Sequence, residues 1–185
     1  MALMRRFLCW NLQTATFAGF IYIIVAAGTA LLLRCLDMAS ASPYIDFTIS
    51  RGFDMGWRSH QMYAFLVSDV IVSICHIFII LFSLYMLYNV TQLHFVLYMT
   101  TMKWYNYAFI MYTIIEFCFS VFEFSFYGLN TFRREFVVFI WLWWLFRTAL
   151  NIVVMLVLSA RTTEMEDEMA MELRFSDKKY VHSYA

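Results

Sequence analysis

The amino-acid sequence predicts an all-α membrane protein in which four transmembrane helices form a bundle and both termini lie in the cytosol. Of its 185 residues, 63% are apolar and only 14% are charged, which is more hydrophobic surface than a soluble domain of this length can bury. The apolar residues gather in four runs, each long enough to cross a hydrocarbon core about 30 Å thick as a helix. Strands would leave backbone polar groups unpaired in lipid, so helices are expected.

The predicted spans cover residues 14–33, 62–88, 105–128 and 136–160. After the first span, residues 34–61 form a polar loop that contains the single proline of the chain. Residues 93–102 are unusually apolar for a connection, and we assign them either to a longer second helix or to the membrane interface. The connection at residues 129–135 is short, which makes the last two helices antiparallel neighbours.

The chain is predicted to contain one membrane domain, residues 1–160, and an acidic cytosolic tail, residues 161–185. In this tail Met165, Met169 and Leu173 recur at every fourth position among acidic residues, so a helix there would have one apolar stripe. Two interpretations stay open. The tail either extends the fourth helix into solvent or docks onto a cytosolic partner.

The distribution of basic residues indicates the orientation. The side that holds both termini would carry Arg5, Arg6, Lys103, Arg161, Arg174, Lys178 and Lys179. The opposite side would carry Arg34, Arg51, Arg58, Arg133 and Arg134. Basic residues are enriched on the cytosolic side of membrane proteins, so seven basic residues against five favour cytosolic termini. The glycosylation sequon that begins at Asn89 would then face the cytosol.

Two opposite charges are predicted near the membrane midplane, Glu116 in the third span and Arg147 in the fourth. Each costs roughly 2.5 to 3.5 kcal/mol at that depth, so an ion pair between neighbouring helices is the favoured arrangement. The pair is either a structural clamp or part of a site for a substrate, proton or partner helix. Asp69 and Asn151 are expected to face the bundle interior, and His76 and Glu123 are further polar residues within the spans that could support the pair.

Small residues lie four apart along the first span, at Ala15 and Gly19 and again at Ala26 and Ala30. This spacing lets another helix of this chain or of a partner approach closely. Cys9 precedes the first span beside basic residues, a position where reversible palmitoylation is common, and an ordinary buried thiol is the alternative.

Several function classes are disfavoured. A formal net charge of zero provides no basic field for nucleic acid. Motifs of nucleotide-binding, hydrolase or metalloprotease sites are missing from the sequence, so no enzymatic activity and no cofactor are predicted. The four histidines and four cysteines lack the spacing of a metal site or a disulfide framework.

Three short segments resemble the lysosome-associated protein transmembrane (LAPTM) family, in its short invertebrate form. They are CWNLQTAT at residues 9–16, IEF at residues 115–117 and FRTALN at residues 146–151. The resemblance implies an endosomal, lysosomal or Golgi four-helix protein that acts in trafficking or regulates other membrane proteins. The family's proline-rich tyrosine motifs are missing here, because Tyr180 and Tyr184 have no neighbouring proline, so recruitment of ubiquitin ligases is not implied.

The leading functional hypothesis is therefore a non-enzymatic accessory subunit or trafficking adaptor of a larger membrane protein, surrounded by membrane lipids in an endomembrane or the plasma membrane. The competing hypothesis is a small transporter, or a protein that binds lipids or metabolites, with a polar site around Glu116, Arg147 and His76. A claudin-like junction protein is a weaker third reading, because the loop after the first span has Trp57 without a cysteine pair.

Overall fold

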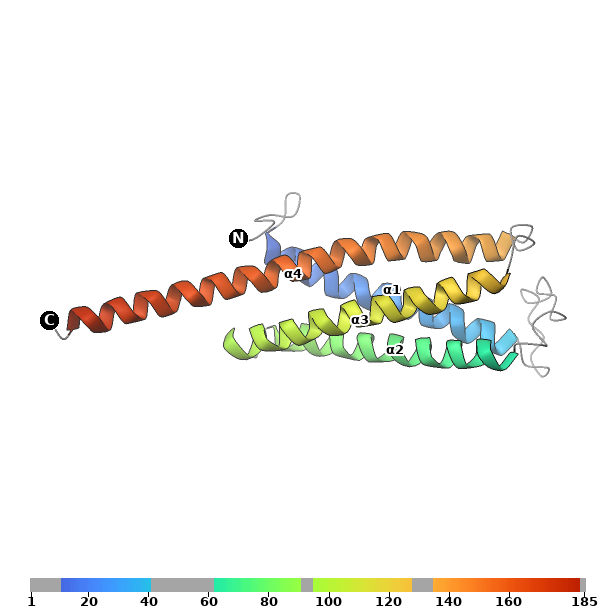
Figure 1. Ribbon diagram of the computed structural model, residues 1–185, viewed down its shortest axis with the longest axis horizontal. Helices are drawn as coiled ribbons and strands as arrows, with labels where there is room; N and C mark the ends of the chain where they lie inside the picture. Colours follow the sequence, from blue (N-terminus) through green and yellow to red (C-terminus); the bar gives the residue numbers. More distant parts are fainter. Residues whose placement is uncertain (1–10, 41–61, 91–94, 128–134, 184–185) are drawn as a thin grey trace.

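The computed structural model describes residues 11–40, 62–90, 95–127 and 135–183. In these ranges the chain is helical and contains no strand. The helices are α1 (Leu12–Ser40), α2 (Met62–Asn89), α3 (Phe95–Tyr127) and α4 (Glu135–Ser183). They alternate in direction, so that α1 begins and α4 ends toward the same end of the molecule (Figure 1). Each helix packs against the next one, and α4 packs back against α1, which closes an up-and-down bundle.

All four helices are long and apolar enough to cross a membrane. The qualifying stretches are Leu12–Leu36, Val67–Asn89, Phe95–Ser125 and Trp141–Arg174. The predicted order and helical character of the four spans are thus confirmed, and the chain has the features of an integral membrane protein. Large apolar side chains such as Val25, Ile74 and Leu81 are exposed on the outside of the bundle, as expected for helices surrounded by lipid.

The boundary of the third helix differs from the prediction. Residues 95–102 belong to α3, and neither extend α2 nor form a separate interfacial segment. They continue α3 because Met99 and Met102 are buried in the bundle while the residues between them are more exposed. Lys103 consequently lies near the beginning of α3, where its Nζ is 2.6 Å from Glu166 Oε1 of α4.

The end of the first helix also differs from the prediction. The polar loop was predicted to begin at Arg34, but α1 continues through Arg34 to Ser40. The reason is tertiary, since the Arg34 side chain finds two acidic partners inside the bundle, on α2 and α3. The rest of the predicted loop, residues 41–61, lies outside the described residues.

The core is aromatic at its centre. Tyr105 of α3 is fully buried, with its ring 5.0 Å from that of Phe20 on α1 and 5.0 Å from that of Phe82 on α2, measured between centroids. Its hydroxyl lies 2.7 Å from the hydroxyl of Ser83, so the one polar atom of this large side chain is satisfied in an apolar setting. The centre of the bundle is therefore fixed by ring packing as well as by charge.

The small residues of α1 are used within the chain itself. Ala15, Ala26 and Ala30 are buried, and Gly19 lies so close to α4 that a Cβ there would be 3.3 Å from Val154 Cγ1. The helix that approaches these small residues closely is therefore a helix of this chain and not of a partner protein.

The predicted tail is continuous with the fourth helix. α4 has 49 residues and runs through residue 160 without a break, so the residues after that position extend the helix. The expected apolar stripe is only partly available to a partner, because Met165 is fully buried by this chain. Met169 is half-buried and Leu173 is 62% exposed. Any docking surface on the tail therefore begins after Met165.

Candidate functional site: two layers of buried charge

The first layer is built around an ion pair between α3 and α4. Arg147 Nη2 donates to Glu116 Oε1, and the two residues are 5% and 3% exposed. Arg147 also donates through Nη1 to the carbonyl oxygen of Ala26, 3.4 Å away on α1. A charge-assisted hydrogen bond in an apolar interior is stronger than a neutral one. The guanidinium thus ties three helices together at one level.

His76 brings α2 into the same layer. Its Nε2 is 3.8 Å from Glu116 Oε1, and its Nδ1 is 3.1 Å from the hydroxyl of Tyr112. Between α1 and α4, the Tyr22 hydroxyl of α1 donates to the carbonyl oxygen of Arg147 at 3.3 Å and to Asn151 Oδ1 at 3.4 Å. All four helices therefore contribute polar groups to the first layer.

The second layer is centred on Arg34. Its Nη1 donates to Asp69 Oδ1 at 2.5 Å and to Glu123 Oε1 at 2.9 Å, so α1, α2 and α3 meet at one guanidinium. Ser68 of α2 donates its hydroxyl hydrogen to Glu123 Oε1 as well. Glu116 and Glu123 are seven positions apart on α3, which places the two layers about 11 Å from each other along the bundle at 1.5 Å per residue.

The sequence does not predict Arg34 as a site residue, because Arg34 directly follows the first apolar run and has the position of a loop residue. It does predict Asp69 in the bundle interior and Glu123 within the third span, but without a partner for either. That was the usable signal, since buried carboxylates need a cation. Arg34 is the basic residue at the matching end of the neighbouring span.

The remaining predicted site residues are placed as follows. Asn151 and His76 are buried in the first layer, and Ala15, Gly19, Ala26 and Ala30 pack inside the bundle. Cys9 lies outside the described residues. Within the described ranges the cysteines are free thiols, at Cys35, Cys75 and Cys118. In that same part of the chain, no group of three or more His, Cys, Asp or Glu side chains could hold a metal ion.

Most polar side chains of the two layers are bonded to one another across helix boundaries. This arrangement fixes which helices are neighbours and in which register, because each ion pair forms only when its partners reach the same depth. Over the residues that the structure describes, the fold and these layers define a helical protein whose four membrane-length helices are joined by ion pairs in the bundle interior. Comparison of the chain with protein-family models, with curated proteins and with solved structures finds no match.

Proposed function

We propose that this chain is a non-enzymatic integral membrane protein that serves as an accessory subunit or trafficking adaptor of a larger membrane protein. The observation that carries the proposal is the length of α4. Its 49 residues span about 73 Å at 1.5 Å per residue, more than twice the thickness of a hydrocarbon core. α4 runs well past the ends of the other three helices (Figure 1). A helix that projects this far presents a surface beyond the membrane.

The interior of the bundle supports a scaffolding role. Arg147 is held by the carboxylate of Glu116 on one neighbouring helix, and Arg34 is held by carboxylates on two. Side chains bonded in this way hold a helix in position. A rigid bundle is a suitable base for a projecting helix, because the direction of α4 is then set by its contacts with α1 and α3.

The chemistry of the projecting segment indicates the kind of surface that would bind it. Asp167 and Glu172 are exposed there, and the apolar side chains of Met169 and Leu173 lie 40° apart around the helix at 100° per residue. An amphipathic helix binds by placing its apolar stripe in a groove. The acidic flanks favour a groove with a basic rim, on a cytosolic domain of the partner.

The cytosolic orientation of this segment is part of the proposal. Arg34 and Arg161 are both largely buried and paired with carboxylates, so each side loses one basic residue from its count, which leaves six against four. This difference favours cytosolic termini. Asn89 is only 6% exposed, so its sequon is expected to stay unmodified on either side of the membrane. The test is antibody access to an epitope tag at the C-terminus after selective permeabilisation of the plasma membrane. A cytosolic tag is stained under this condition, and a tag stained only after internal membranes are also opened would place the termini on the other side.

The location is proposed to be an endomembrane of the endosome, lysosome or Golgi, with the plasma membrane as the alternative. The resemblance of the short motifs around Glu116 and Arg147 to the LAPTM family supports it. Fluorescence microscopy of the tagged full chain against organelle markers is the test, and retention in the endoplasmic reticulum of healthy cells would contradict the assignment.

Two matched variants test the docking role of α4. Met169 lies on the proposed apolar stripe, whereas Met171 is 200° away around the helix and is exposed. Burial of a methionine side chain contributes about 1.5 to 3 kcal/mol. Met169→Asp should therefore weaken partner binding roughly tenfold or more, and Met171→Asp should leave it near the wild-type level.

The measurement is quantitative mass spectrometry of proteins that co-purify with the full chain in mild detergent after cross-linking in intact cells. A partner supports the proposal when it is lost from Met169→Asp and is retained by Met171→Asp. Its recovery should also fall when the purification is repeated at high salt without cross-linking. Equal recovery with both variants would show that the stripe is not the binding surface.

A further inference from the structure

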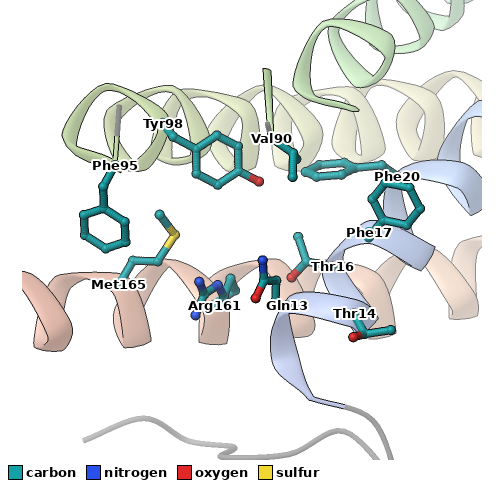
Figure 2. A pocket seen from close by; sticks show the side chains of 10 residues that line it. All are labelled: Gln13, Thr14, Thr16, Phe17, Phe20, Val90, Phe95, Tyr98, Arg161 and Met165. Atoms are coloured by element: carbon teal, nitrogen blue, oxygen red, sulfur yellow. The ribbon is translucent and has the colours of Figure 1, made fainter. Parts of the chain in front are cut away.

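A cavity of about 420 Å³ lies at the end of the bundle where α1 begins, and all four helices or their ends contribute to it. Figure 2 shows Phe20 and Phe17 at its inner end, Phe95 and Met165 at its outer end, and Arg161 between them. This volume lies within the range of small-molecule sites. The cavity is separate from the two charged layers, so neither of them explains it.

Thr16 lies in the wall of this cavity with an unsatisfied hydroxyl. The residue is 3% exposed, and Oγ1 has no hydrogen-bond partner. The buried hydroxyl of a helical threonine ordinarily donates to its own backbone. Thr113 and Thr162 do so, to the carbonyl oxygens of Phe109 and Leu158. An unpaired buried hydroxyl costs roughly 1 to 3 kcal/mol, so a group that enters the cavity and pairs with Thr16 would be stabilised.

The charge of Arg161 is already compensated. Its Nη1 donates to Glu164 Oε2 at 2.5 Å and lies 3.6 Å from Glu168 Oε1. Arg161 is the only cationic side chain among the described residues that line the cavity. With two carboxylates beside it, Arg161 carries no net positive charge, so an anionic headgroup gains no electrostatic attraction there. A neutral hydroxyl or carbonyl can accept a hydrogen bond from Arg161 without being repelled by the carboxylates.

The depth of the cavity suits an amphiphile. Ala26 and Arg147 are in contact, and they mark the level of the bundle that the sequence places near the membrane midplane. From that level Phe20 is about 9 Å away, Thr16 about 15 Å and Arg161 about 21 Å, at 1.5 Å per residue. Half of a hydrocarbon core is about 15 Å. The inner end of the cavity therefore lies among acyl chains, and its polar groups lie at the headgroup boundary.

We propose that this cavity binds a neutral membrane lipid whose polar head is a hydroxyl group, either a sterol or a diacylglycerol. The hydroxyl bonds at the level of Thr16, with Arg161 about 6 Å further toward the headgroups, and the apolar body extends inward toward Phe17 and Phe20. This site is independent of the docking segment on α4.

The experiment uses the purified full chain in phosphatidylcholine nanodiscs. Three photoreactive lipids are added separately: a sterol, a diacylglycerol and, as the anionic comparison, a phosphatidylserine. Cross-linked peptides are mapped by mass spectrometry, and excess unlabelled lipid measures saturable binding. Labelling by the sterol alone or by the diacylglycerol alone identifies the source of the hydroxyl, and labelling by both supports the shared chemistry.

Three variants test the site itself. Thr16→Val removes the hydroxyl at constant shape and should lower apparent affinity about fivefold, the value of one hydrogen bond. Thr29→Val is the control on the same helix, because the Thr29 hydroxyl already donates to the Ala26 carbonyl. Thr14→Trp places a large ring at the exposed edge of the cavity and should abolish saturable labelling, even if Thr16→Val folds poorly.

Saturable labelling of cavity peptides by a hydroxyl lipid, lost in Thr14→Trp and kept in Thr29→Val, establishes the site. The proposal is overturned if phosphatidylserine labels these peptides as strongly as the neutral lipids do. It is also overturned if labelling is unchanged in both Thr16→Val and Thr14→Trp.

Discussion

Neutralisation of Glu116 in the presence of Arg147 separates a structural clamp from a transport site. Glu116→Gln keeps the shape of the side chain and an amide oxygen that can accept a hydrogen bond, but it removes the negative charge that faces the buried guanidinium of Arg147. An unpaired arginine at membrane depth costs roughly 2.5 to 3.5 kcal/mol, and loss of one partner of a buried pair costs about 3 to 5 kcal/mol. We therefore expect Glu116→Gln to lose about 3 kcal/mol of stability.

The opposite single variant, Arg147→Met, should lose less stability than Glu116→Gln. In Arg147→Met the remaining Glu116 carboxyl can take up a proton and become neutral, whereas a guanidinium stays charged in proteins. When both residues are replaced by apolar ones of similar size, no charge is stranded, and stability should return to within about 1 kcal/mol of the wild type. The two losses are then far from additive, as expected for groups in contact.

The assay is thermal unfolding of the purified chain in detergent micelles, followed by the fraction that survives size-exclusion chromatography. A double variant as unstable as the sum of the two single variants would refute the clamp. The transport alternative makes a different prediction. Under that alternative Glu116→Gln folds normally, and a substrate flux that the wild type supports in proteoliposomes is lost.

Two further predictions concern the packing of α1. Arg34→Gln removes the positive charge that Asp69 of α2 and Glu123 of α3 share, and it should lower stability by about 2 to 3 kcal/mol in the same assay. An unchanged unfolding temperature would show that the second layer is dispensable. Gly19→Leu should cost about 1 to 3 kcal/mol because Val154 is in the way. Gly28→Leu, with open space around the added Cβ, should be neutral or slightly stabilising. Equal effects at the two glycines would contradict the close approach of α1 to α4.

The four helices and the partnership of Glu116 with Arg147 could be reached from the sequence. Both follow from the bilayer as solvent, in which backbone polar groups must be paired within a helix and isolated charges are costly. These rules apply to each apolar run separately. The length of a run is therefore enough to predict a helix, and the position of a charge within its run is enough to predict that the charge needs a partner. The place where each run ends was less predictable, as the extensions of α1 past Arg34 and of α3 back to Phe95 show.

The second layer, the burial of Met165 and the cavity beside Thr16 were decided by tertiary structure alone. Arg34 sits at the end of an apolar run, and the sequence does not show that α1 brings it within reach of Asp69 and Glu123. Met165 has the periodicity of an exposed stripe, yet α4 packs that position against its own bundle. Such contacts depend on the relative depth and tilt of helices far apart in the chain. Packing across the whole bundle sets both.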